Sequence, residues 1–150
     1  MEIIINSKYG GYGLSPLATM ELAKKKGKEC YFFEYNFKDK IYIPLTIEQA
    51  ETTFLWHAYS VPNPQDYKLH DSDPNGLFIS ANKRAEKIAI NDCSDNRTDS
   101  DLVAVVKKLG KLANGPYADL EIVEIPDEVD YEIAEYDGLE HIAESHRKWY

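Results

Sequence analysis

The sequence predicts an α+β fold, a single domain of residues 1–150 with a mostly antiparallel sheet and about four helices. Three observations predict this class. A short strand that is apolar on both faces opens the chain at Glu2–Asn6. A helix with a clear 3.6-residue period begins near Asp101. In the last third of the chain, turn residues separate a helix, a hairpin and a second helix.

The charge of the chain excludes one class of partner. With 26 acidic and 17 basic side chains, the formal net charge is −9 at pH 7. This charge repels a phosphate backbone, so we expect no direct binding of nucleic acid. An acidic surface can bind a basic protein, also by imitating DNA, but a charge that keeps the protein soluble is the stronger interpretation. The eleven tyrosines favour a contact surface.

The cysteines and the start of the chain predict a cytoplasmic protein. Cys30 and Cys93 are far apart and form no Cys-x-x-Cys pair, which is typical of a reducing compartment. The first residues show no basic stretch followed by a long apolar one, and no apolar run approaches the ~18 residues that cross a bilayer. We therefore expect no membrane partner.

A glycine-rich turn between the first strand and the first helix is a candidate anion site. Ser15 is a good N-cap, and Pro16 suits the first position of a helix that should run to Gly27. Backbone N–H groups of such a turn, beside the positive end of the helix dipole, suit a phosphate. The spacing is neither Gly-x-Gly-x-x-Gly nor a P-loop, and a tight turn that needs positive φ is the alternative. The candidate ligand-binding residues of this turn are Tyr9, Gly10, Gly11, Tyr12, Gly13 and Ser15.

A hairpin and a second helix are predicted next. Two aromatic and β-branched runs, Cys30–Tyr35 and Ile41–Leu45, are joined by a mostly polar connection. Thr46-x-x-Gln49 is a capping box. The helix that it opens should have an inner side formed by Ala50, Thr53, Phe54 and His57. His57, beside Trp56, is a candidate base or ligand-stacking residue, but a partly apolar helix favours a structural histidine.

The segment after this helix is irregular. The Pro-, Asp- and Asn-rich stretch Ser60–Gly76 predicts a surface loop. Within it, Asp71–Gly76 matches the first half of an EF-hand calcium loop, but position twelve would be Asn82 and no flanking helix pair is evident. A β-turn is the stronger interpretation. Leu77–Ser80 and Ile88–Ile90 are short strand candidates.

Thr98–Asp101 caps the third helix, and Arg97 directly precedes it. The apolar side of this helix consists of Leu102, Val105, Val106, Leu109, Leu112 and Ala113. A guanidinium before a helix N-terminus can hold a phosphate or carboxylate ligand, so Arg97 joins the candidate ligand-binding residues. A salt bridge from Arg97 to Asp95 or Asp99 is the alternative.

A hairpin and a last helix are predicted at the end of the chain. Leu120–Ile125 and Val129–Ala134 alternate as strands do, and Pro126–Glu128 turns the chain between them. Asp-x-x-Glu at residues 137–140 then predicts a helix cap. The inner side of that helix would consist of Leu139, Ile142, Ala143, His146 and Trp149. Asp130 and Glu132 share a face, which the many neighbouring carboxylates mark as solvated rather than catalytic.

Patterns typical of metal sites and covalent catalysis are absent from the sequence. His141 and His146 are five residues apart, so on a helix they would point away from each other and would not suit zinc. There is no Gly-x-Ser-x-Gly, and neither cysteine has a recognisable catalytic context. We therefore expect no metal, no cofactor and no catalytic residue.

Motifs at both ends of the chain resemble a group of small proteins encoded by bacteriophages and prophages. The motifs are Ile3–Ser15 at the front, then Arg97–Val103, Ala113–Leu120, Ile122–Asp127, Glu135–Glu140 and His146–Trp149. The likeness covers about the first 25 and the last 55 residues. It implies a phage origin and says little about activity.

Three functions follow from this resemblance as expectations. The first is a counter-defence sponge that sequesters a nucleotide signal of bacterial immunity, with the Gly10–Ser15 turn and Arg97 holding phosphates and a tyrosine stacking on a base. The second is an inhibitor that covers a host defence protein through an acidic, tyrosine-bearing surface. The third, weaker one is a small phage enzyme of unknown chemistry. Because sponges often build their pockets between protomers, the resemblance also makes a homodimer an expectation.

Overall fold

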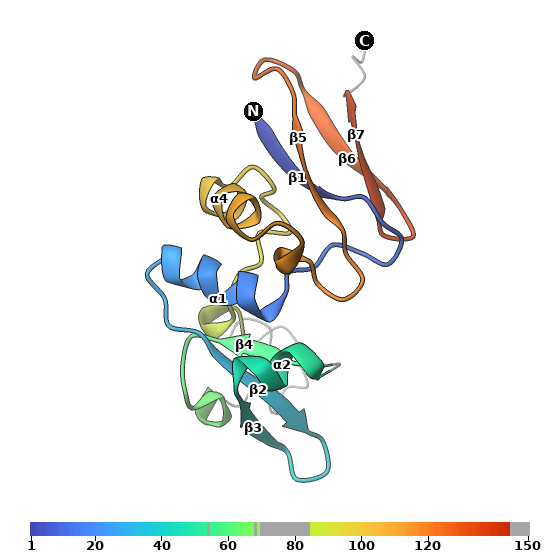
Figure 1. The fold of residues 1–150 in the computed structure, drawn as a ribbon. Helices are drawn as coiled ribbons and strands as arrows, with labels where there is room; N and C mark the ends of the chain where they lie inside the picture. The colour runs from blue at the N-terminus through green and yellow to red at the C-terminus, as the bar shows by residue number, and fades with distance from the viewer. Residues whose placement is uncertain (54, 68, 70–84, 145–150) are drawn as a thin grey trace, which may run out of the picture. The chain divides into compact units, whose positions relative to one another are not determined.

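The structure of the chain is a computed structural model, and it describes residues 1–53, 55–67, 69 and 85–144 (Figure 1). Their helices and three small antiparallel sheets confirm the predicted α+β class. The chain divides into two compact units, of which unit 1 consists of Met1–Leu22 and Asp92–Tyr150, and unit 2 of Ala23–Asn91. The organisation as one domain stays a prediction. Every helix within the described residues is too short or too polar to span a bilayer.

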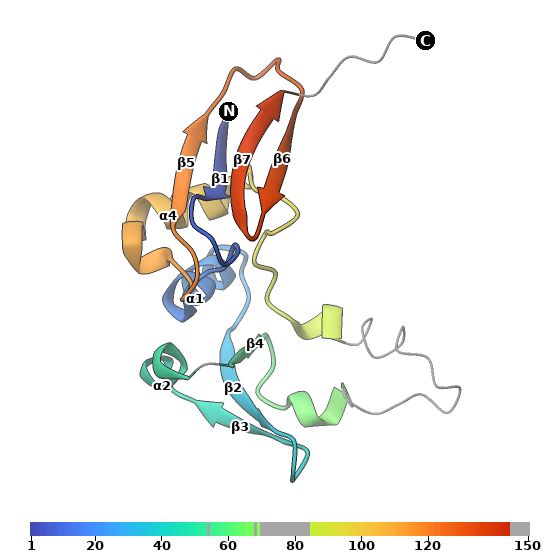
Figure 2. The ribbon, with the colours of Figure 1, turned by 90° about the vertical axis from the view of Figure 1, so that its right-hand side faces the viewer.

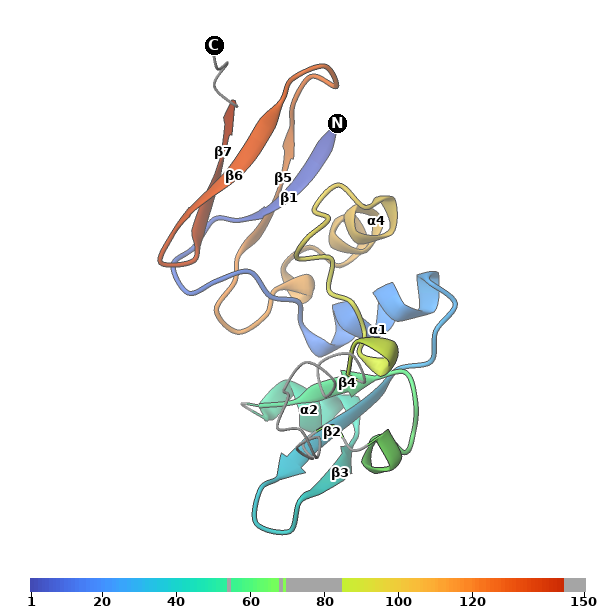
Figure 3. The same ribbon diagram turned by 180° about the vertical axis from the view of Figure 1, so that it is seen from behind.

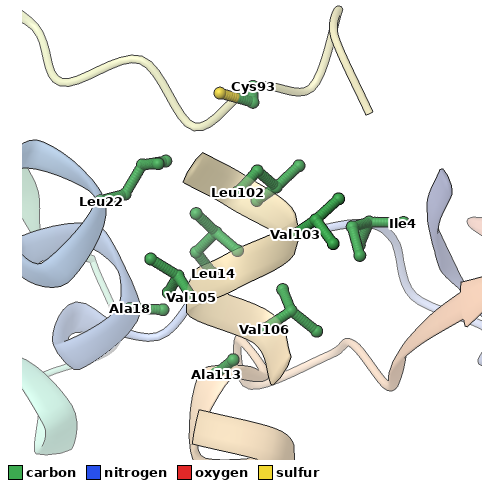
Figure 4. Close-up of a cluster of buried hydrophobic side chains, with 10 residues drawn as sticks. All are labelled: Ile4, Leu14, Ala18, Leu22, Cys93, Leu102, Val103, Val105, Val106 and Ala113. Carbon is green, nitrogen blue, oxygen red and sulfur yellow. The ribbon is translucent and has the colours of Figure 1, made fainter. Parts of the chain in front are cut away.

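The core of unit 1 is built on β1 (Glu2–Asn6) and α4 (Ser100–Leu109). β1 pairs antiparallel with β5 (Leu120–Glu124), with Ile4 opposite Ile122. Both faces of β1 are buried, as its apolar run predicts, and Ile4 packs among the side chains gathered around α4 (Figure 4). This cluster consists of Ile4, Leu14, Ala18, Leu22, Cys93, Leu102, Val103, Val105, Val106 and Ala113.

Helix caps in this unit follow the sequence closely. Ser15 caps α1 (Pro16–Lys25) with its hydroxyl, and Asp99 caps α4 with its carboxylate. After α4 the chain continues as the 3₁₀ turn η2 (Gly110–Ala113), which leaves Leu112 exposed. The prediction that Leu112 lies on the inner side is therefore wrong, because the period tightens there from 3.6 to about 3 residues.

The last described element is a strand and not the predicted helix. β7 (Leu139–Glu144) pairs antiparallel with β6 (Tyr131–Tyr136) across the two-residue turn Asp137–Gly138. The φ angles of the two turn residues are positive, 49° and 85°. Asp-Gly strongly favours this hairpin turn, and that preference outweighs the helix-cap pattern. His146 and Trp149, which the sequence predicts on the inner side of that helix, lie outside the described residues.

The hairpin predicted between residues 120–125 and 129–134 is also wrong. β5 pairs with β1 instead, and β6 pairs with β7. Figure 2 shows β1 between β5 and β7, with β6 beyond β7. A local turn signal shows where the chain reverses but not which strands pair. Here the buried apolar strand β1 pairs with β5, because this pairing satisfies the backbone hydrogen-bonding groups along one edge of β1.

Unit 2 contains a three-stranded antiparallel sheet with the order β3-β2-β4 (Figure 3). The predicted hairpin is confirmed as β2 (Tyr31–Asn36) and β3 (Ile41–Leu45), and β4 (His57–Tyr59) pairs with the other edge of β2. The capping box at Thr46 is confirmed and opens α2 (Ile47–Thr52).

Three predictions in unit 2 need correction or lie outside the described residues. α2 ends before His57, which lies in β4 with its ring stacked on Tyr59 at 6.0 Å between centroids. Residues 85–88 are helical and only Ala89 bridges to Tyr59, so the strand Ile88–Ile90 is wrong. The 3₁₀ turn η1 (Pro64–Tyr67) lies in the predicted loop. Phe54, Asp71–Gly76 and Leu77–Ser80 lie outside the described residues.

Candidate functional site

Arg97, the basic residue predicted to hold a ligand, is buried in unit 1 and bonded to the protein itself. Its Nη1 and Nη2 donate to Glu140 Oε1 and Oε2 at 2.6 and 2.8 Å. Its Nε donates to the carbonyl oxygen of Ser94 at 2.9 Å, and Nη1 also reaches the carbonyl oxygen of Ile4 at 3.3 Å. Arg97 therefore forms a bidentate salt bridge with Glu140, in place of the salt bridge expected with Asp95 or Asp99. A phosphate could use this guanidinium only by displacing Glu140.

The Arg97–Glu140 pair completes the edge of β1 that faces away from β5. Ile4 donates its N–H to the carbonyl oxygen of Arg97 at 2.9 Å, and Asn6 donates its N–H to Glu140 Oε1 at 2.8 Å. Burial favours the neutral form of Glu140, but the hydrogen bonds from Arg97 and Asn6 outweigh it and hold the pKa of Glu140 below its ordinary value. An ion pair thus satisfies backbone groups that a further strand would otherwise pair.

Tyr12 belongs to this network and not to an open binding site. The Arg97 guanidinium lies over the Tyr12 ring, 3.7 Å from its centroid, and the Tyr12 hydroxyl donates to the carbonyl oxygen of Asp92 at 2.7 Å. Burial is the main cause that raises the pKa of Tyr12. The candidate residues Tyr12 and Arg97 therefore lie together, but the contacts that they make are internal to the protein.

The glycine turn closes against two other loops of unit 1. Gly10 has a φ of 127° and donates its N–H to the carbonyl oxygen of Asp137 at 2.8 Å. A Cβ on Gly10 would lie 2.8 Å from the Cβ of Tyr117, and one on Gly138 would collide with the backbone of Gly10 and Gly11. The alternative interpretation, a tight turn with positive φ, is confirmed for Gly10 and Gly11.

Ser15 and Gly13 are also engaged by the fold. Ser15 Oγ donates to the carbonyl oxygen of Leu112 at 2.6 Å, besides capping α1. The carbonyl oxygen of Gly13 accepts the N–H of Gly115 at 2.9 Å. Of the predicted ligand-binding residues, Tyr9 is the most clearly exposed, with 60% of its surface accessible.

A strongly acidic segment, not among the candidate site residues of the sequence, forms the strands β5, β6 and β7 of unit 1. From Asp119 to Glu144 there are eleven acidic residues and no lysine or arginine. We call this segment, residues 119–144, the acidic strands. Its exposed acidic residues are Glu121, Glu124, Asp127, Glu128, Asp130, Glu132, Glu135, Asp137 and Glu144. A count of charges in a sliding window would have found it, because the whole chain has a net charge of only −9.

Three exposed tyrosines lie at one end of the acidic strands. Tyr9, Tyr117 and Tyr136 have 60%, 52% and 71% of their surfaces accessible. Their backbones come together because Gly10 packs on Tyr117 and bonds to Asp137. Figure 2 shows the loop after β1 against the turn between β6 and β7. Aromatic side chains beside carboxylates form a surface suited to protein contacts.

A surface hollow of about 410 Å³ lies elsewhere in unit 1. It is lined by Met1, Glu2, Thr98, Ser100, Val103, Ala104 and Lys107. None of the predicted ligand-binding residues is among them. Within the described residues, no group of three or more His, Cys, Asp or Glu side chains is arranged to hold a metal ion.

Comparisons of this chain with protein-family models, with curated proteins and with solved structures found no match. The likeness to phage proteins therefore stays a prediction.

Proposed function

We propose that this protein is a non-enzymatic binding protein that recognises a basic protein surface through its acidic strands. The observation that carries the proposal is the segregation of charge, since nine exposed carboxylates occupy residues 119–144 without a single lysine or arginine. Such a one-signed surface attracts a cationic partner over about a Debye length and speeds its association. In the setting that the phage resemblance implies, the partner is a defence protein of the host cytoplasm.

The exposed tyrosines supply apolar contact area, which the carboxylates do not provide. Exposed ion pairs contribute little affinity each, so a specific complex also needs apolar area that is buried on binding. Tyr9 and Tyr136 offer large accessible rings at the end of the acidic strands. Carboxylates with aromatic neighbours favour a folded or extended basic protein over a small anionic ligand.

A nucleotide sponge has less support. Arg97, the cation assigned to its phosphates, is neutralised by Glu140 at 2.6 Å. The N–H of Gly10 bonds to Asp137. The exposed carboxylates nearby would repel a phosphate. The sponge therefore requires rearrangement of a buried ion pair, whereas protein binding requires none.

A pair of charge-matched variants tests the proposal. In the first, four exposed glutamates of the acidic strands become glutamine: Glu121→Gln, Glu124→Gln, Glu132→Gln and Glu135→Gln. In the control, four exposed glutamates of unit 2 change in the same way: Glu34→Gln, Glu48→Gln, Glu51→Gln and Glu86→Gln. Both variants gain the same charge, so a nonspecific effect of net charge affects them equally.

The readout is capture of partners from a bacterial lysate on immobilised protein. We expect the wild type and the control to retain a stoichiometric basic protein that the acidic-strand variant loses. Recovery of no stoichiometric partner, or equal recovery by both variants, would contradict the proposal.

A further inference from the structure

The outer edge of β6 has a defined set of backbone groups that point away from β7. A two-residue turn with positive φ at both positions makes Tyr136 and Leu139 a hydrogen-bonded pair. Because antiparallel pairing alternates, Glu132, Ala134 and Tyr136 direct their N–H and C=O groups toward β7. Tyr131, Ile133 and Glu135 direct theirs outward.

This outer edge has no strand beside it in the described part of the chain. β6 pairs with β7 alone, and none of its six residues is buried. Proteins usually block such an edge with proline, lysine or a bulge, and β6 contains no proline and no lysine. What it does contain is glutamate, at residues 132 and 135.

In the part of the chain that the structure describes, the outer edges of β5 and β3 are less suitable. On β5, the N–H of Leu120 already donates to Asn114 Oδ1 at 2.8 Å. On β3, Pro44 has no N–H to offer, and Gln65 Nε2 reaches the carbonyl oxygen of Tyr42 at 3.5 Å. Of these three edges, that of β6 can add a strand with the fewest obstacles.

The glutamates decide which strand fits. Antiparallel pairing of β6 with a second copy of itself over the whole strand would set Glu132 opposite Ala134 and Glu135 opposite Tyr131, so neither glutamate would gain an opposite charge. A strand with lysine or arginine at those positions would form opposite-charge pairs instead. The acidic strands provide no cation of their own to compete for these glutamates.

We propose that the outer edge of β6 binds an extended segment of a basic partner protein as an added antiparallel strand. This proposal rests on the proposed function and names its mode of recognition. Backbone bonds to Ile133 and Glu135 would give affinity, and the glutamates would give specificity. Since Glu132 and Glu135 are three residues apart, the partner's cations should be three residues apart as well, on opposite faces of its strand.

Nuclear magnetic resonance on ¹⁵N-labelled protein can test this mode residue by residue. The probe is a capped peptide, Thr-Lys-Val-Thr-Lys-Val-Thr, and its control is the same peptide with both lysines replaced by glutamate. In the free protein, the N–H groups of Glu132, Ala134 and Tyr136 should exchange slowly and those of Ile133 and Glu135 quickly. The lysine peptide should slow exchange at Ile133 and Glu135, and the glutamate peptide should not.

Two variants separate the backbone contribution from the charge. Glu135→Ala removes the carboxylate but keeps the outward N–H, and we expect it to weaken binding of the lysine peptide about two- to fivefold. Glu135→Pro removes both, and we expect it to weaken binding at least about tenfold, because it also deletes an edge hydrogen bond. Circular dichroism and thermal unfolding of each variant establish that it is folded.

The outcomes distinguish the two proposals. If the lysine peptide binds but Ile133 and Glu135 stay unprotected and the two variants weaken binding equally, strand addition is overturned while recognition of a basic partner stands. If the lysine peptide does not bind yet the lysate capture succeeds, strand addition is likewise overturned. If the lysine peptide does not bind and the lysate capture recovers no partner, both strand addition and the proposed function are contradicted.

Discussion

Removing the charge of Glu140 should destabilise unit 1 far more than removing the charge of a surface glutamate. Arg97–Glu140 and Lys107–Glu2 are both ion pairs of 2.6 Å, but their side chains are 8% and 6% accessible in the first and 53% and 36% in the second. Glu140→Gln leaves the Arg97 cation buried without a counter-charge. Breaking a buried pair costs about 3–5 kcal/mol, and the remaining amide oxygen places this variant near the lower end.

The control is Glu2→Gln, which breaks the exposed pair and should cost less than about 1 kcal/mol. The assay is urea unfolding followed by circular dichroism, with thermal unfolding as a second probe. A loss of about 3 kcal/mol corresponds to a Tm about 6–12 °C lower for a chain of this length. Equal losses in the two variants, or a loss below about 1 kcal/mol for Glu140→Gln, would refute the structural role given to the buried pair.

Replacing both Arg97 and Glu140 by apolar residues tests whether the neighbouring backbone groups need this ion pair. Such a replacement is often neutral or stabilising for an isolated buried pair. Here Arg97→Met with Glu140→Leu should still destabilise the fold, because the N–H of Asn6 and the carbonyl oxygens of Ile4 and Ser94 lose their partners. Each unsatisfied group costs about 1–3 kcal/mol. A neutral double variant would show that the pair does not serve the edge of β1.

Further predictions concern pH, glycine, cysteine and nucleotides. The fold lowers the pKa of Glu140 from 4.5, so the charged Glu140 side chain contributes its stabilisation above pH 4.5 and loses it as the pH falls through the lowered pKa. The free energy of unfolding, measured at a series of acidic pH values, should therefore decrease over this range. In the Glu140→Gln variant this decrease should be smaller. Gly138→Ala should lower the Tm more than Gly27→Ala, because both have positive φ but only the first new Cβ meets other atoms. Burial raises the pKa of Cys30 to about 11, so iodoacetamide at pH 8 should label it more slowly than a free thiol, and urea should remove the difference. Cyclic and ADP-ribose-derived nucleotides should give no thermal shift, because Arg97 is already paired, and a clear shift would revive the sponge.

Several elements could be predicted because their signals are local. The caps at Ser15, Thr46 and Asp99 depend on hydrogen bonds that span three residues or fewer, and the structure contains all three. The β2–β3 hairpin follows from two β-branched and aromatic runs around a short loop. The prediction from local signals was wrong at β7. Residues 137–140 match a helix cap, but they include the Asp-Gly pair of a hairpin turn, and the structure contains the turn.

The candidate site was harder to predict, since its contacts join distant parts of the chain. The sequence pointed to Arg97 and to the glycine turn as neighbours in function, yet it could not show that Glu140, 43 residues further on, would neutralise the guanidinium. The carboxylates at residues 119–144 were visible in the sequence, but their exposure depends on which strands pair.

The sequence by itself determined the α+β class, the helix caps, the buried first strand and the excess of acid, because each follows from composition or from neighbours along the chain. Only the tertiary structure decided that β1 pairs with β5 and that an ion pair satisfies its other edge. It also decided that, among the described residues, β6 lies at the edge of its sheet with two glutamates. Pairing and burial are properties of residues brought together from far apart, and no local pattern encodes which of them meet.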